Sequence, residues 1–438
     1  MIKVLQNSRR KIILTVSVIF LVALLPRLFL AFYSTALPIS DASEYDHLAI
    51  NILYGKGFSD DGKPNAFREP LYPYFLASIY YTFGYNYMAV RIIQALFGAL
   101  ICIIIFYISG KLFDFKTGLI SALIASFNPA FIKITEQLLS ENFYIFILII
   151  AIFFLFRQVH KKGINNLVFL GLALGIAALT RSIIFLFPLF IIFLTGRRLV
   201  PKNYSIKKYI LTIFILIFFF ILPISVWTLR NWLVFHKFIP IVSRTGIGLY
   251  ISYFPKDGKF YGFNVLDATN ENAKFLTLKA DQTIFWVKET LKFIKNNPTR
   301  FLKLEFLKTL YFWSPFDWEI IGYGVYNFMY GFIVPFFICG VFITLKRFRE
   351  LLPIYLPIIY SFFIALVTYG SPRFRLPIEP YLIIIASVGI TYFIGRFSKK
   401  VYPILITSGY LLLNLFFYVN SYQLKIVTRN IFEKIHIW

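Results

Sequence analysis

The chain has 438 residues, of which 59% are hydrophobic, 20% aromatic and 15% charged. A soluble domain has about 45–50% apolar and about 25% charged residues, so this composition excludes a cytosolic globular enzyme. It also excludes a disordered chain, a coiled coil and a collagen, because 53 phenylalanines and 29 tyrosines describe densely packed, lipid-facing helices. The sequence therefore predicts an all-α polytopic integral membrane protein.

Basic residues outnumber acidic ones, with 45 Lys and Arg against 20 Asp and Glu and a formal net charge of +25. In a soluble protein this excess would suggest nucleic acid. In a membrane protein, basic residues in short loops hold helix ends against anionic lipid, so we expect membrane lipids rather than nucleic acid as partners. A basic lining around a phosphate-bearing substrate is the alternative. Cys102 and Cys339 lie in apolar runs, which indicates neither a disulfide framework nor a metal site.

Apolar stretches recur along the chain, and a helix needs ~20 residues to cross the hydrocarbon core. They predict about eleven transmembrane helices, at residues 12–33, 87–109, 117–131, 142–158, 165–179, 182–195, 209–226, 326–345, 351–368, 377–395 and 401–421. The first stretch exceeds the signal-peptide core of about 7–15 residues, which favours an uncleaved helix over a cleaved signal peptide. The shorter aromatic segment 70–84 predicts an interfacial helix.

The basic residues fall in alternate short loops, within residues 3–11, 111–116, 157–162, 197–208, 346–349 and 396–400. The positive-inside rule places these loops in the cytoplasm, which predicts a multi-pass protein of the plasma (inner) membrane with a cytoplasmic N-terminus and an external C-terminal tail. Loops 34–86 and 227–325 then lie outside, and each is expected to carry interfacial helices, in the second at 299–313. The sequence has no nucleotide-binding motif. Residues 1–438 are predicted to form one transmembrane domain.

Polar residues that are not cytoplasmic anchors gather at the outer end of the predicted spans. A charge at the centre of a membrane helix costs at least ~2.5 kcal/mol, so such residues are candidate functional residues. They are Asp41, Glu44, Asp46, Arg68, Glu69, Glu136, Glu141, Arg181, Arg230, Arg244, Arg373 and Arg375. Arg27, in the first span, is instead expected to snorkel to the outer interface. The four histidines show no metal-ligand spacing and are expected to be non-catalytic.

Several of these candidates also have purely structural interpretations. Asp41 follows Ser40 and begins a helix-like stretch, where an acidic residue suits a helix N-terminus. Arg181 lies at the apex of the hairpin 165–195, which is too short for two full spans, so its guanidinium is expected to be buried. A buried guanidinium requires an anion, either a carboxylate such as Glu141 or a phosphate. Arg373 and Arg375 are either snorkelling anchors or anion ligands.

Taken together, these features are consistent with a single reaction site. They are a carboxylate in the first outer loop, several arginines that could bind a phosphate, and apolar surroundings. They indicate transfer of a group from a lipid-linked phosphate to a hydroxyl, with the carboxylate accepting the hydroxyl proton and the arginines stabilising the leaving phosphate. Such a donor needs no cytosolic pocket, in agreement with the missing nucleotide motif.

An ordered set of motifs resembles the C-type glycosyltransferases of the protein O-mannosyltransferase and lipid A aminoarabinose transferase family. The motifs are SDASEYDHLAINILYGKGFS, FREPLYPYFLASIYYTFGYNYMAVR, LLSENFYIF, GLALGIAALTRSIIFLFP, the RNW of 230–232 and SPRFRLPIEP. The resemblance implies a polytopic helical fold, a polyprenyl-phosphate sugar donor and inverting transfer on the extracytoplasmic side.

The resemblance places the family's catalytic aspartate on Asp41. It identifies further substrate-binding candidates, which together with those from the polar pattern are Glu44, Tyr45, Arg68, Tyr72, Glu141, Arg181, Arg230, Arg373 and Arg375. Many members have Glu directly after the aspartate, where this chain has Ala42, so a bound divalent metal is not supported and no cofactor is predicted. Glu44 is an alternative second carboxylate, because residues three apart share a helix face.

The acceptor is expected to be a lipid or glycan rather than a protein, because the loop 227–325 is short for an added soluble domain. The main rival function is a flippase or transporter of a lipid-linked glycan, and the third is a non-catalytic scaffold. A transporter would distribute polar residues along the spans on both sides, whereas here they concentrate at the outer end.

Overall fold

Apolar helices dominate the computed structural model, which describes residues 2–60, 62–201, 205–243, 249, 252–253, 283–316, 326–368, 370–396, 401–421 and 423. In these ranges six helices are long and apolar enough to cross a membrane. They are α1 (Ile2–Tyr33), α4 (Tyr87–Leu112), α7 (Ser140–His160), α10 (Ile206–Phe235), α15 (Phe328–Thr344, extended by the 3-10 turn η5, Leu345–Arg347) and α18 (Glu379–Arg396). Shorter apolar helices are α5 (Phe115–Ser126), α8 (Ile164–Thr180), α16 (Leu352–Val367) and α19 (Val401–Val419). The predicted all-α polytopic membrane fold is confirmed, whereas the count of about eleven spans stays a prediction.

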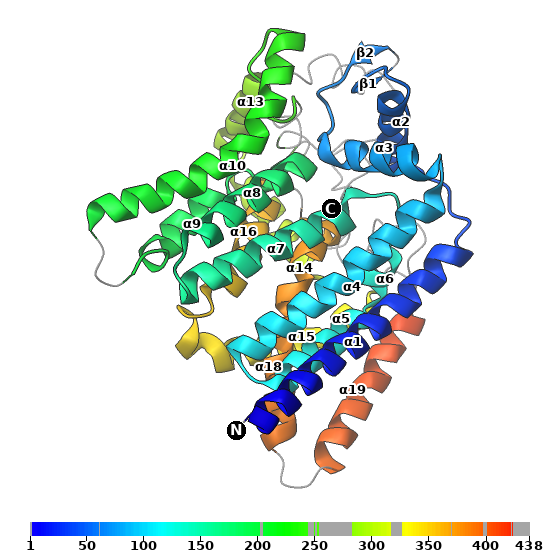
Figure 1. The fold of residues 1–438 in the computed structure, drawn as a ribbon, viewed down its shortest axis with the longest axis vertical. Coiled ribbons are helices and arrows are strands. Elements are labelled where there is room, and N and C mark those ends of the chain that lie inside the picture. The colour runs from blue at the N-terminus through cyan, green and yellow to red at the C-terminus, as the bar shows by residue number, and fades with distance from the viewer. Residues whose placement is uncertain are drawn as a thin grey trace.

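The remaining elements of the described ranges are short. They are α2 (Asp41–Leu53), β1 (Ser59–Asp60), β2 (Lys63–Pro64), α3 (Leu71–Phe83), α6 (Pro129–Lys133), η1 (Ser182–Ile184), α9 (Phe187–Thr195), η2 (Gly196–Arg198), α13 (Thr283–Asn296), α14 (Pro298–Trp313), α17 (Pro372–Arg375) and η6 (Leu376–Ile378). β1 and β2 form a two-stranded antiparallel hairpin. Figure 1 shows this hairpin, α2 and α3 together at one end of the helix bundle, with the N-terminus at the other end.

Two predicted spans are interrupted. The predicted span 117–131 ends as α5 at Ser126, after which Asn128 accepts hydrogen bonds from the amides of Ala130 and Phe131 and starts α6. The predicted span 182–195 begins with the 3-10 turn η1, and α9 starts only at Phe187. Pro129 and Pro188 both lie in the first turn of the new helix, where a proline is tolerated. These local helix-start signals divide each predicted span into two helical segments, although the apolar pattern of the sequence is continuous.

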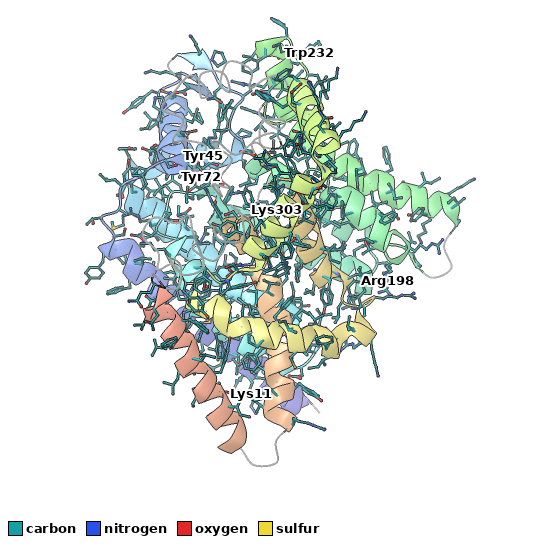
Figure 2. All side chains as sticks on the ribbon, turned by 180° about the vertical axis from the view of Figure 1, so that it is seen from behind. Lys11, Tyr45, Tyr72, Arg198, Trp232 and Lys303 are labelled. Atoms are coloured by element: carbon teal, nitrogen blue, oxygen red, sulfur yellow. The ribbon has the colours of Figure 1, made fainter. Side chains whose placement is uncertain are left out.

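Basic loops of the described ranges lie close together at the end of the bundle away from α2. Arg347 Nη2 donates to the carbonyl oxygen of Leu112 over 3.0 Å. Lys162 donates to the carbonyl of Arg198, and Arg198 donates to that of Arg349. Figure 2 shows Lys11 near the opposite end from Tyr45 and Tyr72. The grouping of basic loops on one face agrees with the pattern in the sequence.

Arg27 does not snorkel to the interface as expected. Its side chain is fully buried, and its guanidinium donates to the carbonyl oxygens of Ser126 (3.0 Å) and Ala125 (3.2 Å) at the end of α5. The last carbonyls of a helix have no intrahelical partner and carry a partial negative charge, so they are suitable partners for a buried cation. The arginine therefore joins α1 to the C-terminus of α5.

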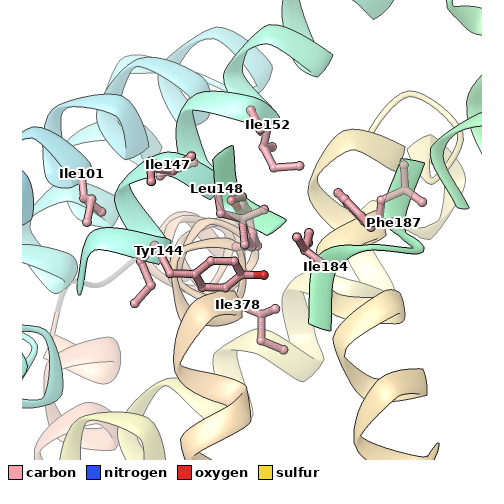
Figure 3. Close-up of a cluster of buried hydrophobic side chains, with 14 of the residues drawn as sticks. Ile101, Tyr144, Ile147, Leu148, Ile152, Ile184, Phe187 and Ile378 are labelled. Atoms are coloured by element: carbon pink, nitrogen blue, oxygen red, sulfur yellow. The ribbon is translucent and has the colours of Figure 1, made fainter. Parts of the chain in front are cut away.

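The core is continuous from the membrane helices to the polar end of α7. Figure 3 shows Tyr144 and Leu148 of α7 in one cluster with Ile184, Phe187 and Ile378. These residues come from α7, from the turn and helix after Arg181, and from the turn that follows α17. The cluster fixes the segments that bear Glu141, Arg181 and Arg373 to one another.

Helices α15 and α18 pack backbone to backbone at two glycines. A Cβ atom at Gly389 would overlap the carbonyl oxygen of Phe336, and one at Gly340 would overlap that of Ile385. Small residues allow membrane helices to approach this closely.

Gly389→Ala is therefore expected to force α15 and α18 apart and to lower the free energy of unfolding by roughly 1–3 kcal/mol, as overpacking does elsewhere. Thermal unfolding of the purified protein in detergent measures this loss. Gly395→Ala is the control: it lies in the same helix, and no atom of the described residues outside its own helix backbone and chain neighbours lies within 4 Å of the added methyl, so it should unfold at the wild-type temperature or above. Equal unfolding temperatures for both variants would contradict the account.

Candidate active site

The first turn of α2 presents two acidic side chains. Ser40 has φ 53° and turns the chain sharply into the helix, a conformation that a residue with a side chain rarely adopts. Asp41 and Glu44 then lie one turn apart on the same face of α2. Asp41 does stand at the helix N-terminus, but both of its carboxylate oxygens bind arginine side chains from other segments.

Arg68 binds both acids of α2. Its Nη2 donates to Asp41 Oδ1 over 2.7 Å, and its Nε donates to Glu44 Oε2 over 2.5 Å. The Arg68 guanidinium also lies 5.5 Å from the centre of the Tyr45 ring. The planar, forked guanidinium suits this simultaneous contact, which a lysine ammonium would not reproduce.

Arg373 joins the first outer loop to a distant part of the chain. Its Nη1 donates to Asp41 Oδ2 over 2.9 Å, and its Nε donates to Glu141 Oε1 over 2.5 Å. Arg181 Nη1 forms an ion pair of 2.9 Å with the same Glu141 oxygen. We refer to these six side chains as the ion-pair network: Asp41, Glu44, Arg68, Glu141, Arg181 and Arg373.

Members of the network differ in their exposure. The Glu141 and Arg68 side chains are 2% and 6% exposed, Arg181 is 16% and Asp41 19% exposed, and Arg373 reaches 32%. Arg181 is half-buried and pairs with Glu141, one of the two anions that the sequence offered as its partner. Glu44 is the most exposed member at 52%, and Arg373 is the most exposed of the three arginines, so these two side chains are the most accessible to an incoming molecule.

The arginines keep the Asp41 carboxylate ionised. Burial by itself raises the pKa of Asp41, but the charges and hydrogen bonds of Arg68 and Arg373 outweigh burial and hold the pKa well below its ordinary value. The same pairing holds the pKa of Arg68 above its ordinary value although burial opposes the charge. Because the folded-state pKa of Asp41 is depressed, the stability it contributes is present above the ordinary carboxyl pKa and is lost as the pH falls towards the depressed value.

Glu69 positions the turn after Arg181. Its Oε1 accepts hydrogen bonds from the backbone amide of Ser182 (3.1 Å) and from Ser182 Oγ (2.8 Å). The adjacent residues Arg68 and Glu69 therefore reach two different parts of the site. The sequence marked Glu69 as unusual, but no feature of it indicated Ser182 as its partner.

Asp46 fixes α2 to its neighbours. Its carboxylate accepts hydrogen bonds from the hydroxyls of Tyr80 (2.5 Å), Tyr85 (2.6 Å) and Tyr87 (3.0 Å). The carboxylate is buried, and each tyrosine belongs to α3, to the following turn or to the start of α4. Asp46 is thus a structural anchor of the helix that carries Asp41.

Tyr45 and Tyr72 lie beside the network and not within it. Both side chains are buried, and their rings meet edge to face at 5.2 Å. The Tyr72 hydroxyl donates to Gln94 Oε1 over 2.9 Å, which secures α3 to α4. Burial raises the pKa of the Tyr45 hydroxyl, so this residue stays neutral beside the arginines.

The structure does not bring Arg230 and Arg375 to the network. Arg230 donates to the carbonyl oxygens of Phe58 and Asn65, both over 2.9 Å, and so holds the β1–β2 hairpin against α10. Arg375 donates to two carbonyls at the end of α14, those of Phe312 and Ser314, both over 2.7 Å.

Glu136 also lies apart from the network. Glu136 pairs with Lys133 and accepts a hydrogen bond from Ser34. Arg244 lies outside the described residues. In the ranges that the structure describes, no group of three or more His, Cys, Asp or Glu side chains has a metal-binding arrangement. Asp41, Glu44 and Glu141 each bind arginine instead.

Removal of the Asp46 carboxylate should destabilise the protein. Asp46→Ala leaves the buried hydroxyl of Tyr80 without its acceptor, which is expected to lower the free energy of unfolding by roughly 1–3 kcal/mol. Asp60→Ala is the control, because the Asp60 side chain is 58% exposed and pairs with His47 at the surface. Thermal unfolding in detergent compares the two, and an Asp60→Ala loss as large as that of Asp46→Ala would contradict the anchoring role.

Part of the chain resembles a known sequence family. Residues 63–227 match the sequence model of the dolichyl-phosphate-mannose-protein mannosyltransferase family. No curated protein sequence matches the chain.

Solved structures of low sequence identity share the fold. The oligosaccharyltransferase of Archaeoglobus fulgidus in its apo form is 15% identical, with a TM-score of 0.56 over 92% of this chain and 54% of that one. The archaeal oligosaccharyltransferase AglB from Archaeoglobus fulgidus, in complex with an inhibitory peptide and a dolichol-phosphate, is 13% identical, with a TM-score of 0.56 over 92% of this chain and 54% of that one. ArnT from Cupriavidus metallidurans bound to undecaprenyl phosphate is 14% identical, with a TM-score of 0.53 over 92% of this chain and 62% of that one. The chain thus spans little more than half the length of these proteins. The resemblance indicated by the sequence motifs is confirmed, because the chain has the fold of the C-type glycosyltransferases and, over residues 63–227, the sequence pattern of their mannosyltransferase family.

Proposed function

We propose that the chain is an inverting glycosyltransferase that moves a sugar from a polyprenyl-phosphate donor to a hydroxyl of a lipid or glycan acceptor. The observation that carries this proposal is the position of Asp41 between two arginines, one on each carboxylate oxygen. A base for the acceptor hydroxyl thus lies directly beside cations suited to the donor phosphate. The site lies at one end of an apolar bundle, where a lipid-linked substrate is available from the bilayer.

The reaction is a single displacement at the anomeric carbon of the donor sugar. The acceptor oxygen forms a bond to this carbon while the bond from the carbon to the phosphate oxygen breaks, and its electron pair stays on the phosphate. The acceptor proton passes to the Asp41 carboxylate. Attack from the face opposite the leaving phosphate inverts the anomeric configuration, as in inverting glycosidases with a hydroxyl in place of water.

The arginines have different roles in this step. Arg68 holds Asp41 from the side of Glu44 and orients it. Arg373 and Arg181 stabilise the charge that develops on the leaving phosphate, and Glu141 holds both of them in place. Arg230 and Arg375 are assigned to the support of the fold and not to phosphate binding, because their guanidinium groups bind backbone carbonyls.

The donor class is supported by the neighbours in fold. ArnT was solved with undecaprenyl phosphate, and AglB with a dolichol-phosphate. The family matched by residues 63–227 is named for a dolichyl-phosphate mannose donor. A lipid or glycan acceptor is preferred to a protein because the segment 227–325 is short for an added soluble domain.

The orientation follows from the charge pattern. The basic loops gather at the end away from α2, so we assign that end to the cytoplasm and the ion-pair network to the extracytoplasmic side. The N-terminus then lies in the cytoplasm.

Asp41→Asn is expected to lower sugar transfer by about 10²–10⁴-fold, since the amide cannot accept the acceptor proton. The assay uses the full chain in proteoliposomes with radiolabelled polyprenyl-phosphate mannose and an envelope lipid and glycan fraction from a strain that lacks the protein. Asp60→Asn, which removes an exposed charge on the β1–β2 hairpin, is the control and should keep wild-type transfer.

Three results of this assay separate the candidate functions. Transfer of label to the acceptor fraction that depends on Asp41 supports the glycosyltransferase. Movement of labelled donor across the bilayer without transfer would identify a flippase, and neither activity would indicate a scaffold. Full transfer by a folded Asp41→Asn protein would remove Asp41 from the mechanism.

A further inference from the structure

We infer that binding of the donor phosphate activates Asp41 as a base. The phosphate binds Arg373 and so separates this arginine from Asp41. Only then can the Asp41 carboxylate accept the proton of the acceptor hydroxyl. This inference rests on the proposed function and assigns to that site a mode of activation by its own donor. Arg373 is the residue that couples the two events.

The first argument is the occupancy of Asp41. One carboxylate oxygen accepts from Arg68 Nη2 at 2.7 Å, and the other accepts from Arg373 Nη1 at 2.9 Å. A carboxylate with a cation on each oxygen is a weak base, and the depressed pKa of Asp41 agrees with this. A general base works best with a pKa near the working pH, so the paired carboxylate is poorly suited to accept a proton.

The second argument is the balance of charge. The ion-pair network contains three carboxylates and three arginines, and Glu69 adds a further acid beside Ser182. Each arginine already faces a carboxylate. A phosphodiester that carries one negative charge must therefore obtain its cation from an existing pair, because the network has no excess of positive charge.

The third argument identifies which pair opens. Arg68 is 6% exposed and bound to two acids of one helix, so its release would take a buried guanidinium away from two carboxylates at once. Arg181 is 16% exposed and points to the buried Glu141. Arg373 is the most exposed of the three at 32%, and its Nη2 donates no hydrogen bond to any residue in the described ranges. Arg373 is therefore the cation that a phosphate reaches first.

When Arg373 moves away from Asp41, the other contacts of the network keep Asp41 and Glu141 in place. Arg68 still holds Asp41 Oδ1, which keeps the carboxylate oriented, and Arg181 still pairs with Glu141. Asp41 Oδ2 is then open to the acceptor hydroxyl. When the product phosphate leaves, Asp41 releases the accepted proton to water and pairs with Arg373 again, so a hydroxyl is activated only while a donor is present.

The test measures binding of undecaprenyl phosphate, without a sugar, to the full chain in nanodiscs. If the phosphate competes with Asp41 for Arg373, removal of the competitor should strengthen binding, so Asp41→Asn is expected to bind about 10-fold more tightly than the wild type. Asp60→Asn is the charge control, since it removes one negative charge from an exposed side chain of the β1–β2 hairpin that pairs with His47 and not with an arginine of the network. It is expected to change the dissociation constant by less than about 2-fold, and in an Arg373→Gln background Asp41→Asn is expected to have no effect.

The outcomes distinguish this inference from the proposed function. A wild-type protein that binds no undecaprenyl phosphate would overturn both. Equal affinity of the wild type and Asp41→Asn would overturn the inference alone, and so would equal strengthening by Asp60→Asn or strengthening that persists without Arg373. Thermal unfolding in the same nanodiscs checks that each variant is folded, and Asp41→Ala makes the same comparison if the asparagine variant is not.

Discussion

The contact between Asp41 and Arg373 joins residues 332 positions apart and unites the two halves of the site. Asp41 comes from the first helix after α1, and Arg373 comes from the short helix that precedes α18. Buried charged groups are costly unless they are paired, so the buried Glu141 and the partly buried Asp41 both depend on Arg373 for part of their pairing. This requirement determines how the outer end of the bundle is assembled.

The surrounding contacts hold the two halves in register, and several of them use arginine on backbone carbonyls. Arg375 binds the end of α14 on one side of Arg373, and Arg230 holds the β1–β2 hairpin that leads to Arg68. Asp46 secures α2 through tyrosine hydroxyls. The six charges can therefore exchange partners while the backbone that carries them stays fixed, which the proposed displacement of Arg373 by a phosphate requires.

Sequence patterns predicted the elements with a strong local signal. The aromatic segment 70–84 contains α3, the amphipathic run 299–313 lies in α14, and the short hairpin apex brings Arg181 to Glu141. The partners of Arg27, Arg230 and Arg375 were not predictable. They are backbone carbonyls, and because every residue has one, the residue type does not show which carbonyl an arginine binds. The breaks in the spans 117–131 and 182–195 were missed for a different reason: single capping and proline positions interrupt an apolar pattern that is otherwise continuous.

The most direct measurement is a structure of the full chain with undecaprenyl phosphate bound. The account predicts that a phosphate oxygen lies within about 2.7–2.9 Å of the Arg373 guanidinium. It also predicts that Arg373 and Asp41 separate beyond the ion-pair distance of about 4 Å while Arg68 stays on Asp41. A phosphate bound away from Arg373, or an Asp41–Arg373 pair that stays closed around a bound phosphate, would contradict it.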